Sequence, residues 1–515
     1  MSTSSDQATS VQASTAPLTH ADWQARAAGL VFETRAFIDG AYVESTGCDT
    51  FPAWNPATGE VLAHITACTE QDIDRAVIAA RRAFDSGIWS RQSPQARKAV
   101  LQRFSALISE HAEELALLQT LEMGKPIGDS LGFDLAETAR SVAWYAEAID
   151  KHYDEIAPTG ENVHATITRE ALGVVAAVVP WNFPLMIASW KFAPALALGN
   201  SVVLKPAESS SLSALRLAAL ATDAGIPSGV FNVTPGLGAV AGQALGLHME
   251  VDALAFTGST ATGKRFMRYA SESNLKRVWL ECGGKSPHIV FADCPDLDMA
   301  ARAAADAIFI NQGEVCIAGS RLYVDDAIYD DFMPRLIACA RAMPAGDPLN
   351  PATRMGALVS ADHHQKVLGF VETALAEGMT LHQGGGSLPP SAACAGGWYL
   401  EPTIVEGAHD STVMREEIFG PVLGVTRFNG EDEAVAMAND SVYGLGAGLW
   451  TRDLARAHRV SRRLKAGLVW VNCYADGDIS VPFGGVKQSG FGRDKSLHAL
   501  DKYSDLKTTW INLDY

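Results

Sequence analysis

The sequence predicts an α/β protein built on two parallel sheets, and three observations support that prediction. Short runs rich in Val, Ala and Leu alternate with amphipathic stretches through most of the 515 residues, which is the pattern of strands connected by helices. The runs are apolar throughout, as expected of parallel strands covered on both faces. They fall into two series, before and after Glu281, so we expect two sheet domains joined near LECGGKSP.

The expected elements begin after an N-terminal segment that has no basic residue before Arg26 and no apolar core. We expect a disordered tail over 1–30 and no secretory signal. Amphipathic patterns predict a helix over 72–87 and another that begins at Ser105 and is stopped by Gly124 and Pro126.

The first series of strands comprises ALGVVAAVVP, NSVVLKPAE, GVFNVTPG and VDALAFTGS, and the second comprises HIVFADC, RLYVDD, GVTRF, AGLW and GLVWVN. Two other segments, ENVHATITREALG and KYSDLKTTWINLDY, alternate polar and apolar residues. Each is therefore expected to be an exposed strand that invites pairing with another chain.

Composition argues against several classes of partner. The chain has 41 basic and 59 acidic side chains, a net charge of −18, and such a surface repels nucleic acid and anionic lipid. Residues 171–190 are uncharged, but Pro180 and Pro184 interrupt them, so we expect no membrane span. The eight cysteines form no C-x-x-C pair and no Cys/His cluster. This favours reduced thiols in a cytoplasmic protein without a metal site.

Two motifs indicate a dinucleotide site at the carboxyl ends of the first strands. In LAFTGSTATGKRF, Ser259 follows a strand and can cap a helix whose free N–H groups suit a pyrophosphate. In VVLKPAES, Lys205 and Glu208 follow a strand end, where a carboxylate can bind ribose hydroxyls and would repel a 2′-phosphate. The motifs favour NAD over NADP, although helix capping alone, or a solvated loop, remains an alternative for each.

Three further motifs contain groups that together describe one reaction. VVPWNFP fixes Asn182 in an apolar wall, where its amide could donate to an oxyanion, and WLECGGKSP ends a strand on Glu281, a candidate general base. FINQGEVCIAGSR places Cys316 after a glycine-containing turn, before an expected helix whose N–H groups would favour the thiolate. With a dinucleotide, these groups would oxidise an aldehyde through a thioester that water hydrolyses. Singly, a turn asparagine, a hydrogen-bonded glutamate and a packed cysteine remain alternatives.

The motifs PWNFP, KPAE, FTGST, LECGGKSP, NQGEVC, EEIFGPV and PFGGVKQSG follow one another in the chain. With them, the sequence from about Arg35 onward resembles the NAD(P)-dependent aldehyde dehydrogenase superfamily. The resemblance implies a nucleophile, a general base, an oxyanion donor and a residue that supports this donor, which are Cys316, Glu281, Asn182 and Lys191. It also implies NAD as cofactor, bound by Val179, Trp181, Lys205, Glu208, Gly238, Phe256, Gly258, Ser259, Gly263, Glu417 and Phe419.

The family resemblance further implies the aldehyde dehydrogenase fold, with two Rossmann-like parallel-sheet domains and a β oligomerisation arm. After the tail, the expected regions are an NAD-binding domain over 31–152 and 173–283, a catalytic domain over 284–490, and an arm over 153–172 and 491–515. The arm implies a homodimer or homotetramer.

The segment VNCYADGDISVPFGGVKQSGFGRDKSLHALDKY is similar to bacterial enzymes of polyamine catabolism and putrescine degradation. Those enzymes oxidise aminobutyraldehyde, its γ-glutamyl derivative or guanidinobutyraldehyde. Asp476 and Asp478 fall in the loop expected to line the substrate tunnel, where a carboxylate could hold a cationic tail, although a tight turn also explains them. The expected substrate contacts are Phe183, Trp190, Asp476 and Phe483.

Other functions stay open at this point. A broad-specificity aliphatic or betaine-type aldehyde dehydrogenase would need no contribution from Asp476. The presence of all the catalytic groups opposes a catalytically silent protein that kept the fold, and Glu281 opposes a CoA-acylating enzyme. A plain thiol hydrolase would need a histidine partner, which no motif supplies. Two residues depart from the family pattern, because Glu314 replaces the more usual Gln and Cys282 the more usual Leu. Glu314 could raise the thiol pKa if it faces inward, or it could face solvent.

Overall fold

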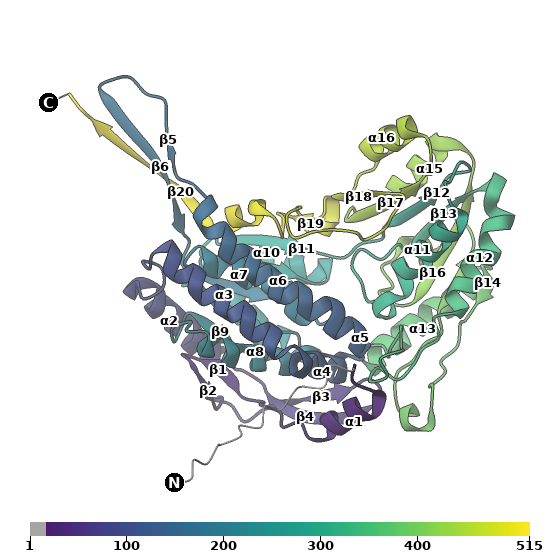
Figure 1. Cartoon of the computed structure of the whole chain (residues 1–515), viewed down its shortest axis with the longest axis horizontal. Helices are drawn as coiled ribbons and strands as arrows, with labels where there is room; N and C mark the ends of the chain where they lie inside the picture. The colour runs from purple at the N-terminus through teal and green to yellow at the C-terminus, as the bar shows by residue number, and fades with distance from the viewer. Residues whose placement is uncertain (1–16, 515) are drawn as a thin grey trace, which may run out of the picture.

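The computed structural model describes residues 17–514 and contains two lobes, each built around a largely parallel sheet, with an arm projecting from the first lobe (Figure 1). The first sheet is eight-stranded, in the order β19-β11-β10-β7-β8-β9-β1-β2. The strands from β11 to β9 run parallel, as predicted from their apolar sequences. The strands of this sheet are β1 (Ala36–Ile38), β2 (Ala41–Val43), β7 (Val174–Val178), β8 (Ser201–Lys205), β9 (Phe231–Val233), β10 (Ala253–Thr257), β11 (Arg277–Glu281) and β19 (Gly490–Phe491).

The second sheet is seven-stranded, in the order β14-β15-β16-β13-β12-β17-β18. Only its edge strand β14 runs antiparallel to its neighbour. The five apolar runs predicted to form the second series all lie in this sheet, so that prediction is confirmed. The strands are β12 (Pro287–Val290), β13 (Arg321–Asp325), β14 (Thr380–Gln383), β15 (Thr403–Glu406), β16 (Val422–Phe428), β17 (Gly446–Trp450) and β18 (Leu468–Val471).

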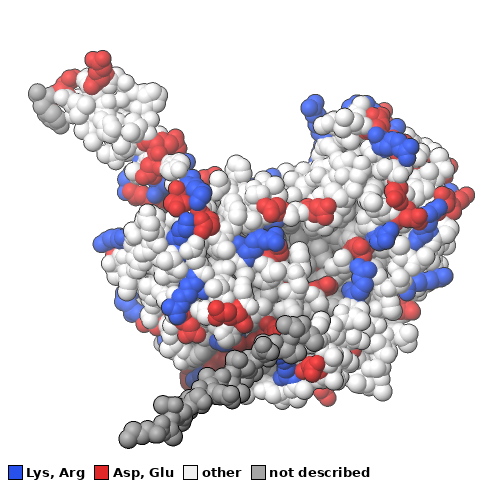
Figure 2. Space-filling view, viewed as in Figure 1, with Lys and Arg blue, Asp and Glu red and all other residues white. Residues whose placement is uncertain are grey.

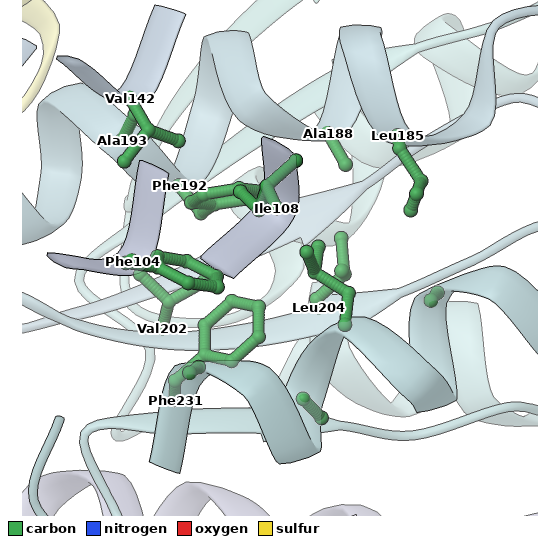
Figure 3. Packing of buried hydrophobic residues seen from close by; sticks show 14 of the residues in the cluster. Phe104, Ile108, Val142, Leu185, Ala188, Phe192, Ala193, Val202, Leu204 and Phe231 are labelled. Carbon is green, nitrogen blue, oxygen red and sulfur yellow. The ribbon is translucent and has the colours of Figure 1, made fainter. Parts of the chain in front are cut away.

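Helices cover both faces of the first sheet, which explains why its strands are apolar without alternation. Val202 and Leu204 of β8 pack into one hydrophobic cluster, whereas Val203 between them packs into another on the opposite face. Figure 3 shows the first of these clusters, where Phe104 and Phe192 from two helices meet the sheet. The larger helices of the chain are α2 (Glu70–Ser86), α3 (Pro94–Glu110), α4 (Ala112–Met123), α6 (Ala136–Ala148), α7 (Pro184–Ala197), α8 (Leu212–Asp223), α10 (Thr260–Glu272), α11 (Leu297–Phe309), α12 (Tyr329–Arg341), α13 (Ala361–Ala376), α15 (Gly430–Asn439) and α16 (Leu454–Arg463).

The helix predicted over 72–87 is confirmed, and Gly87 ends it in the left-handed conformation with φ 79°. The single helix predicted from Ser105 to Gly124 was wrong, because the structure divides that segment between α3 and α4. The backbone of His111 leaves the helical region, with φ −100° and ψ 16°. The chain therefore changes direction there without a glycine or proline to mark the position.

The predicted N-terminal tail differs from the structure over its last third. Residues 1–16 lie outside the described part, but α1 (His20–Ala28) is an ordered helix. Thr19 and Asp22 cap its first turn reciprocally, and Trp23 is buried against the first lobe. One short capping box and one tryptophan thus order a segment whose composition resembles that of a tail.

The arm is a three-stranded antiparallel sheet of β5 (Glu155–Ile156), β6 (Val163–Ala171) and β20 (Ser504–Asn512). Its strands extend away from both lobes (Figure 1). Leu500 and Tyr503, just before β20, still pack in the core of the first lobe. A hairpin of β3 (Thr50–Asn55) and β4 (Glu60–Thr66) lies near the N-terminus of the chain. None of the helices in the described residues is long and apolar enough to cross a membrane.

Candidate active site

A cavity of about 750 Å³ lies between the two lobes and is lined by both Cys316 and Glu281. Phe133, Met299 and Val481 on its walls are also exposed to solvent, so they mark its open side. In Figure 2 this face of the molecule is hollowed between the lobes, with acidic and basic side chains interspersed around largely uncharged surface. The cavity is large enough for a small organic substrate.

Cys316 lies in a turn between α11 and β13, not before a helix as predicted from its sequence. The expected helix N-terminus is therefore absent, and its place is taken by a strand. Burial raises the pKa of the Cys316 thiol to about 12, and the Glu417 and Glu281 carboxylates add to this effect. Only the backbone N–H groups of Ile317 and of Cys316 itself favour the thiolate.

Asn182 is buried and is held against the loop that carries Cys316. Its Nδ2 donates to the backbone carbonyl of Glu314 at 2.8 Å, and its backbone carbonyl accepts from Asn311 Nδ2 at 3.2 Å. Asn311 and Gln312 adopt left-handed backbone angles, with φ of 51° and 55°. This strained turn presents the carbonyl of Glu314, two residues before Cys316 in the chain, to the side-chain amide of Asn182.

The Glu314 side chain faces neither Cys316 nor solvent, which were the two orientations considered from sequence. It is fully buried, and its Oε1 accepts from the backbone N–H of Val359 at 2.9 Å. The same oxygen lies 3.8 Å from Nε2 of His363, whose ring donates to the carbonyl of Phe419 at 2.7 Å. Burial raises the pKa of Glu314 well above its usual value.

Glu281 ends β11 and is buried, with no hydrogen-bond partner for either carboxylate oxygen within the described residues. Burial raises its pKa well above the usual range, and the Asp494 carboxylate adds to that effect. Asp494 in turn forms buried ion pairs with Lys191 and Lys502. Although burial opposes it, these two ammonium groups hold the pKa of Asp494 below its usual value. Lys191, expected to support Asn182, therefore pairs with Asp494 instead.

The two glycines after Glu281 allow close approach of other chain segments, as proposed from the sequence. A β-carbon on Gly283 would lie 2.0 Å from Oε2 of Glu417, and one on Gly284 would lie 2.4 Å from the carbonyl oxygen of Cys316. The backbone N–H of Gly284 donates to Oε1 of Glu417 at 2.9 Å. Because neither glycine has a side chain, Glu417 and the loop that carries Cys316 can lie close to the chain that follows Glu281.

Several residues predicted to bind the cofactor meet at the carboxyl ends of β8 and β10. Lys205 Nζ lies 3.8 Å from Oε2 of Glu208, whose Oε1 accepts from the N–H of Gly238 at 2.6 Å. Ser259 caps α10 as predicted, accepting from the N–H of Thr262. A β-carbon on Gly263 would lie 3.0 Å from Sγ of Cys282. This turn of α10 therefore packs closely against the residue that follows Glu281 at the end of β11.

The remaining predicted cofactor residues divide into two groups. The rings of Trp181 and Phe419 pack edge-to-face, 5.4 Å apart, with His363 beside both. By contrast, Val179 and Phe256 are buried in the first lobe, and Phe256 packs against Phe266. Both side chains therefore pack in hydrophobic clusters and do not line the cavity that contains Cys316.

The four predicted substrate residues, Phe183, Trp190, Asp476 and Phe483, all line the cavity that contains Cys316. The rings of Trp190 and Phe483 pack 5.1 Å apart, and the Asp476 carbonyl accepts from Nε1 of Trp470 at 2.7 Å. Asp478, singled out with Asp476 in the sequence, is not among the residues that line the cavity.

Sequence reasoning missed other charged residues of this site. The structure adds Asp129, Glu137, Asp306 and Lys495 to the cavity walls and Asp494 and Lys502 to the surroundings of Glu281. Asp494, Lys495 and Lys502 belong to the stretch GRDKSLHALDK. That run of charged residues without strand or helix periodicity was the available signal. No group of three or more His, Cys, Asp or Glu residues within 17–514 is arranged to hold a metal ion.

A thiol and a buried carboxylate on one cavity, with a helix N-terminus beside a parallel sheet, are typical of a dinucleotide-dependent oxidoreductase that works through a covalent intermediate. Residues 42–509 match the aldehyde dehydrogenase family, and the chain belongs to that family. It is an NAD-dependent enzyme that oxidises aldehydes.

Three relatives cover almost the whole chain. The NADP/NAD-dependent aldehyde dehydrogenase PuuC of Escherichia coli is 54% identical over 493 residues, which are 96% of this chain and 98% of that protein. A structure of gamma-glutamyl-gamma-aminobutyraldehyde dehydrogenase from Burkholderia cenocepacia is 57% identical, with TM-score 0.94 over 96% of this chain and 100% of that one. The indole-3-acetaldehyde dehydrogenase AldA of P. syringae, solved with NAD+ and IAA, is 54% identical with TM-score 0.95, over the same shares of 96% and 100%.

Proposed function

We propose that this enzyme oxidises aldehydes that carry a charged group at the far end, such as ω-amino, γ-glutamylamino or guanidino aldehydes of polyamine catabolism. The observation that supports this proposal most directly is the charge of the cavity. Its walls include four carboxylates, those of Asp129, Glu137, Asp306 and Asp476. A charged tail could be held there while the aldehyde reaches Cys316.

In the proposed mechanism, Cys316 gives its proton to solvent water and its sulfur adds to the aldehyde carbon. The Nδ2 group of Asn182, which now donates to the carbonyl of Glu314, would turn to the developing oxyanion. Bound NAD supplies the acceptor for the hydride that leaves this carbon. Glu281 then takes a proton from water, whose oxygen attacks the thioester carbon. The carbon–sulfur bond breaks, the acid leaves, and Glu281 returns the proton to the Cys316 sulfur.

The groups around Glu281 suit this role. Burial raises the pKa of Glu281 well above its usual value, which makes its carboxylate a stronger base than an exposed glutamate. The ion pairs of Asp494 with Lys191 and Lys502 keep two positive charges beside it. We infer that Asp494, Lys191 and Lys502 position Glu281, and that the two lysines offset the negative charge of its carboxylate.

The residues at the ends of β8 and β10 fit NAD in their chemistry. Glu208 would accept hydrogen bonds from the ribose hydroxyls beside Lys205, and its negative charge would oppose a 2′-phosphate. The N–H groups that begin α10 after Ser259 would hold the pyrophosphate. Glu417 and Phe419 would contact the nicotinamide side, close to Gly283 and Trp181.

A second candidate substrate class is an uncharged or aromatic aldehyde, for which two observations speak. The cavity walls are rich in aromatic side chains, among them Phe133, Trp190 and Phe483. The P. syringae relative is named for indole-3-acetaldehyde, and its identity to this chain is close to that of the gamma-glutamyl-gamma-aminobutyraldehyde enzyme. The two classes can be separated by the charge of the aldehyde alone.

We further propose that the enzyme is a cytoplasmic homodimer or homotetramer whose subunits pair through the arm. Leu506 and Trp510 of β20 are each 64% exposed, which is unfavourable for an isolated strand. We also propose the division into an NAD-binding domain, a catalytic domain and the arm. In support, most of the proposed dinucleotide residues lie in the first lobe, whereas Cys316 lies in the second together with Glu417 and Phe419.

The experiment that tests the substrate proposal measures NADH production with a panel of aldehydes. The panel contains 4-aminobutyraldehyde, 4-guanidinobutyraldehyde, betaine aldehyde and an uncharged aldehyde of equal length, with Asp476→Asn assayed beside the wild type. We expect kcat/KM to favour the charged tails by about tenfold or more, and the preference to fall in the variant. Equal rates on the uncharged aldehyde, unmoved by the variant, would instead identify a general aldehyde dehydrogenase.

A further inference from the structure

Cys316 lies on a tight turn whose backbone orientation affects the reactivity of its sulfur. The N–H of Ala318 donates to the carbonyl of Val315 at 3.0 Å, which closes a four-residue turn with Cys316 as its second residue. Burial and nearby carboxylates oppose ionisation of the thiol, whereas the N–H groups of Cys316 and Ile317 favour it. The thiolate fraction therefore depends on where these two N–H groups point.

One side chain from a distant part of the chain holds this turn. The hydroxyl of Tyr474 donates to the carbonyl of Ile317 at 2.8 Å. Within residues 17–514, Tyr474 is the one residue whose side chain forms a hydrogen bond with the turn over 315–318. The peptide unit between Ile317 and Ala318 is thus fixed at both ends, by Tyr474 at its carbonyl and by Val315 at its N–H.

The loop that carries Tyr474 is itself held in an unusual conformation. Asn472 and Ala475, which lie before and after Tyr474, have φ of 57° and 60°, angles that residues with side chains rarely adopt. The side chain of Asn472 forms two hydrogen bonds of 3.0 Å with the backbone of Thr451, accepting from its N–H and donating to its carbonyl. These contacts leave the Tyr474 ring little freedom to move away from the turn.

The ring of Tyr474 also lies face to face with a buried histidine. The ring centroids of Tyr474 and His288 are 4.8 Å apart, with an interplanar angle of 10°. His288 belongs to β12 and pairs in register with Gly448 of the neighbouring strand β17. A β-carbon on Gly448 would lie 2.5 Å from Cδ2 of Tyr474. The stack and the missing side chain therefore form a slot that fits the tyrosine ring.

His288 contributes the face of its ring and takes no part in proton transfer. Its Nε2 accepts from Nε1 of Trp450 at 2.8 Å, which places the ring hydrogen on Nδ1. Nδ1 has no hydrogen-bond partner among the described residues. Burial lowers the pKa of His288 to about 3, so the ring stays neutral at the pH of the reaction. Its effect on the turn is therefore exerted through Tyr474.

We infer that Tyr474 is a positioning residue of the reaction, whose hydroxyl holds the turn so that its N–H groups face the Cys316 sulfur. His288 supports this role by keeping the Tyr474 ring in place. The inference rests on the proposed function, in which Cys316 is the nucleophile. Tyr474 also lines the substrate cavity, so a role in binding the aldehyde is the alternative that the test has to separate.

The test uses Tyr474→Phe, which keeps the stacked ring and removes only the hydroxyl. Tyr399→Phe is the matched control, because the Tyr399 hydroxyl is also buried and donates to a backbone carbonyl, that of Ala57, but does not line the cavity. The readout is alkylation of Cys316 by iodoacetamide in the enzyme without cofactor, followed on the Cys316 peptide by mass spectrometry. We expect Tyr474→Phe to slow alkylation about three- to tenfold at each pH from about 7 to 9, and the control to change it less than about twofold.

Kinetic constants separate positioning from substrate binding. The rate constant of the NADH burst should fall in Tyr474→Phe by about the same factor as alkylation, because the sulfur adds to the aldehyde in that phase. The KM for NAD should change less than about twofold. A higher KM for the aldehyde, with alkylation and the burst rate unchanged, would make Tyr474 a substrate contact and overturn the inference.

A double-mutant cycle tests whether His288 acts through Tyr474. His288→Gln removes the stacked ring and retains an acceptor for Trp450. We expect it to slow alkylation of Cys316 in the wild-type background and to have no further effect in the Tyr474→Phe background. Additive losses would show that His288 acts on the turn independently of Tyr474 and would overturn its assigned role.

The outcomes also separate this inference from the proposed function. Alkylation of Tyr474→Phe at the wild-type rate or faster, or an equal loss in both tyrosine variants, would overturn the inference. Alkylation reports on the thiol itself and does not depend on the reaction assigned to it. Aldehyde oxidation that survives Cys316→Ser would instead contradict the proposed function, whatever the effect of Tyr474→Phe on alkylation.

Discussion

At Cys316 burial and the backbone act on the thiol in opposite directions. Burial and two nearby carboxylates raise the pKa of the thiol to about 12, and the N–H groups of the turn only partly oppose this. In the enzyme without cofactor, the thiolate fraction should therefore rise about tenfold per pH unit through the neutral range. The expected result is a rate of alkylation by iodoacetamide that increases steadily between pH 6 and pH 9. A plateau below pH 8 would show that the thiol is already ionised in the free enzyme.

Glu281 is predicted to act after the hydride has left the substrate. Its carboxylate oxygens have no partners in the described residues, so Glu281→Gln should leave the fold intact while removing the base. We expect kcat to fall about 10²- to 10⁴-fold, while stopped-flow absorbance still shows a burst of one NADH per active site. Cys316→Ser serves as the control without a burst. A steady-state rate within threefold of wild type would rule out Glu281 as the base.

Variants of Glu314 test how much this buried residue contributes to the stability of the folded protein. Glu314→Ala leaves the N–H of Val359 without its acceptor, which should lower the free energy of unfolding by about 1–3 kcal/mol. Glu314→Gln keeps an acceptor in place and should cost less than about 0.5 kcal/mol near pH 5. Urea denaturation of both variants measures this difference, and equal losses would show that the hydrogen bond is unimportant.

The pH dependence of the same variants has a definite sign. Burial raises the pKa of Glu314 in the folded protein. The stability that this group contributes is therefore complete below its ordinary pKa and is lost as the pH rises toward the folded value. Relative to the wild type, Glu314→Gln should gain stability between pH 5 and pH 8. A difference that stays constant over this range would mean that Glu314 is ionised throughout.

At the scale of elements, the junction after β11 depends on the absence of one side chain. A β-carbon on Gly283 would lie 2.0 Å from Oε2 of Glu417, so Gly283→Ala should displace that carboxylate. We expect the KM for NAD to rise about tenfold, because the proposed contact of Glu417 with the nicotinamide side is disturbed. Gly369→Ala in α13, where nothing lies within 4 Å of the added carbon, is the matched control and should stabilise by up to about 1 kcal/mol. Equal KM values in both variants would contradict this account of the junction.

Much of this junction could be predicted from the sequence, because its signals are local. The apolar runs marked most of the parallel strands of both sheets, although not β15, and strand ends followed by glycine marked Glu281 and Ser259. The environment of Cys316 was predicted wrongly, since small residues after the nucleophile are compatible with a helix or with a strand edge. Lys495 and Asp494 were missed because they lie in irregular chain, and each contacts a residue about 300 positions away in sequence, Trp190 for Lys495 and Lys191 for Asp494.

At the scale of the whole molecule, the arm buries too few apolar side chains to be stable within a single subunit. β6 and β20 pair over nine residues, from Ser504 with Ala171 to Asn512 with Val163. Only residues near the base of this ribbon are covered by the lobes, whereas Leu506 and Trp510 point outward with 64% of their surface exposed. A two- or three-stranded ribbon has marginal stability in water without a packed face.

We therefore expect the double variant Leu506→Lys and Trp510→Lys to break the proposed assembly. The two side chains lie on the same face of β20, and charges there would have to be buried in any interface that uses this face. Light scattering after size-exclusion chromatography should give a multiple of the 54.8 kDa chain mass for the wild type and the single chain mass for the variant. Lys507→Gln, on the opposite face of the strand, is the control and should keep the wild-type mass. A double variant with unchanged mass would place the subunit interface elsewhere on the molecule.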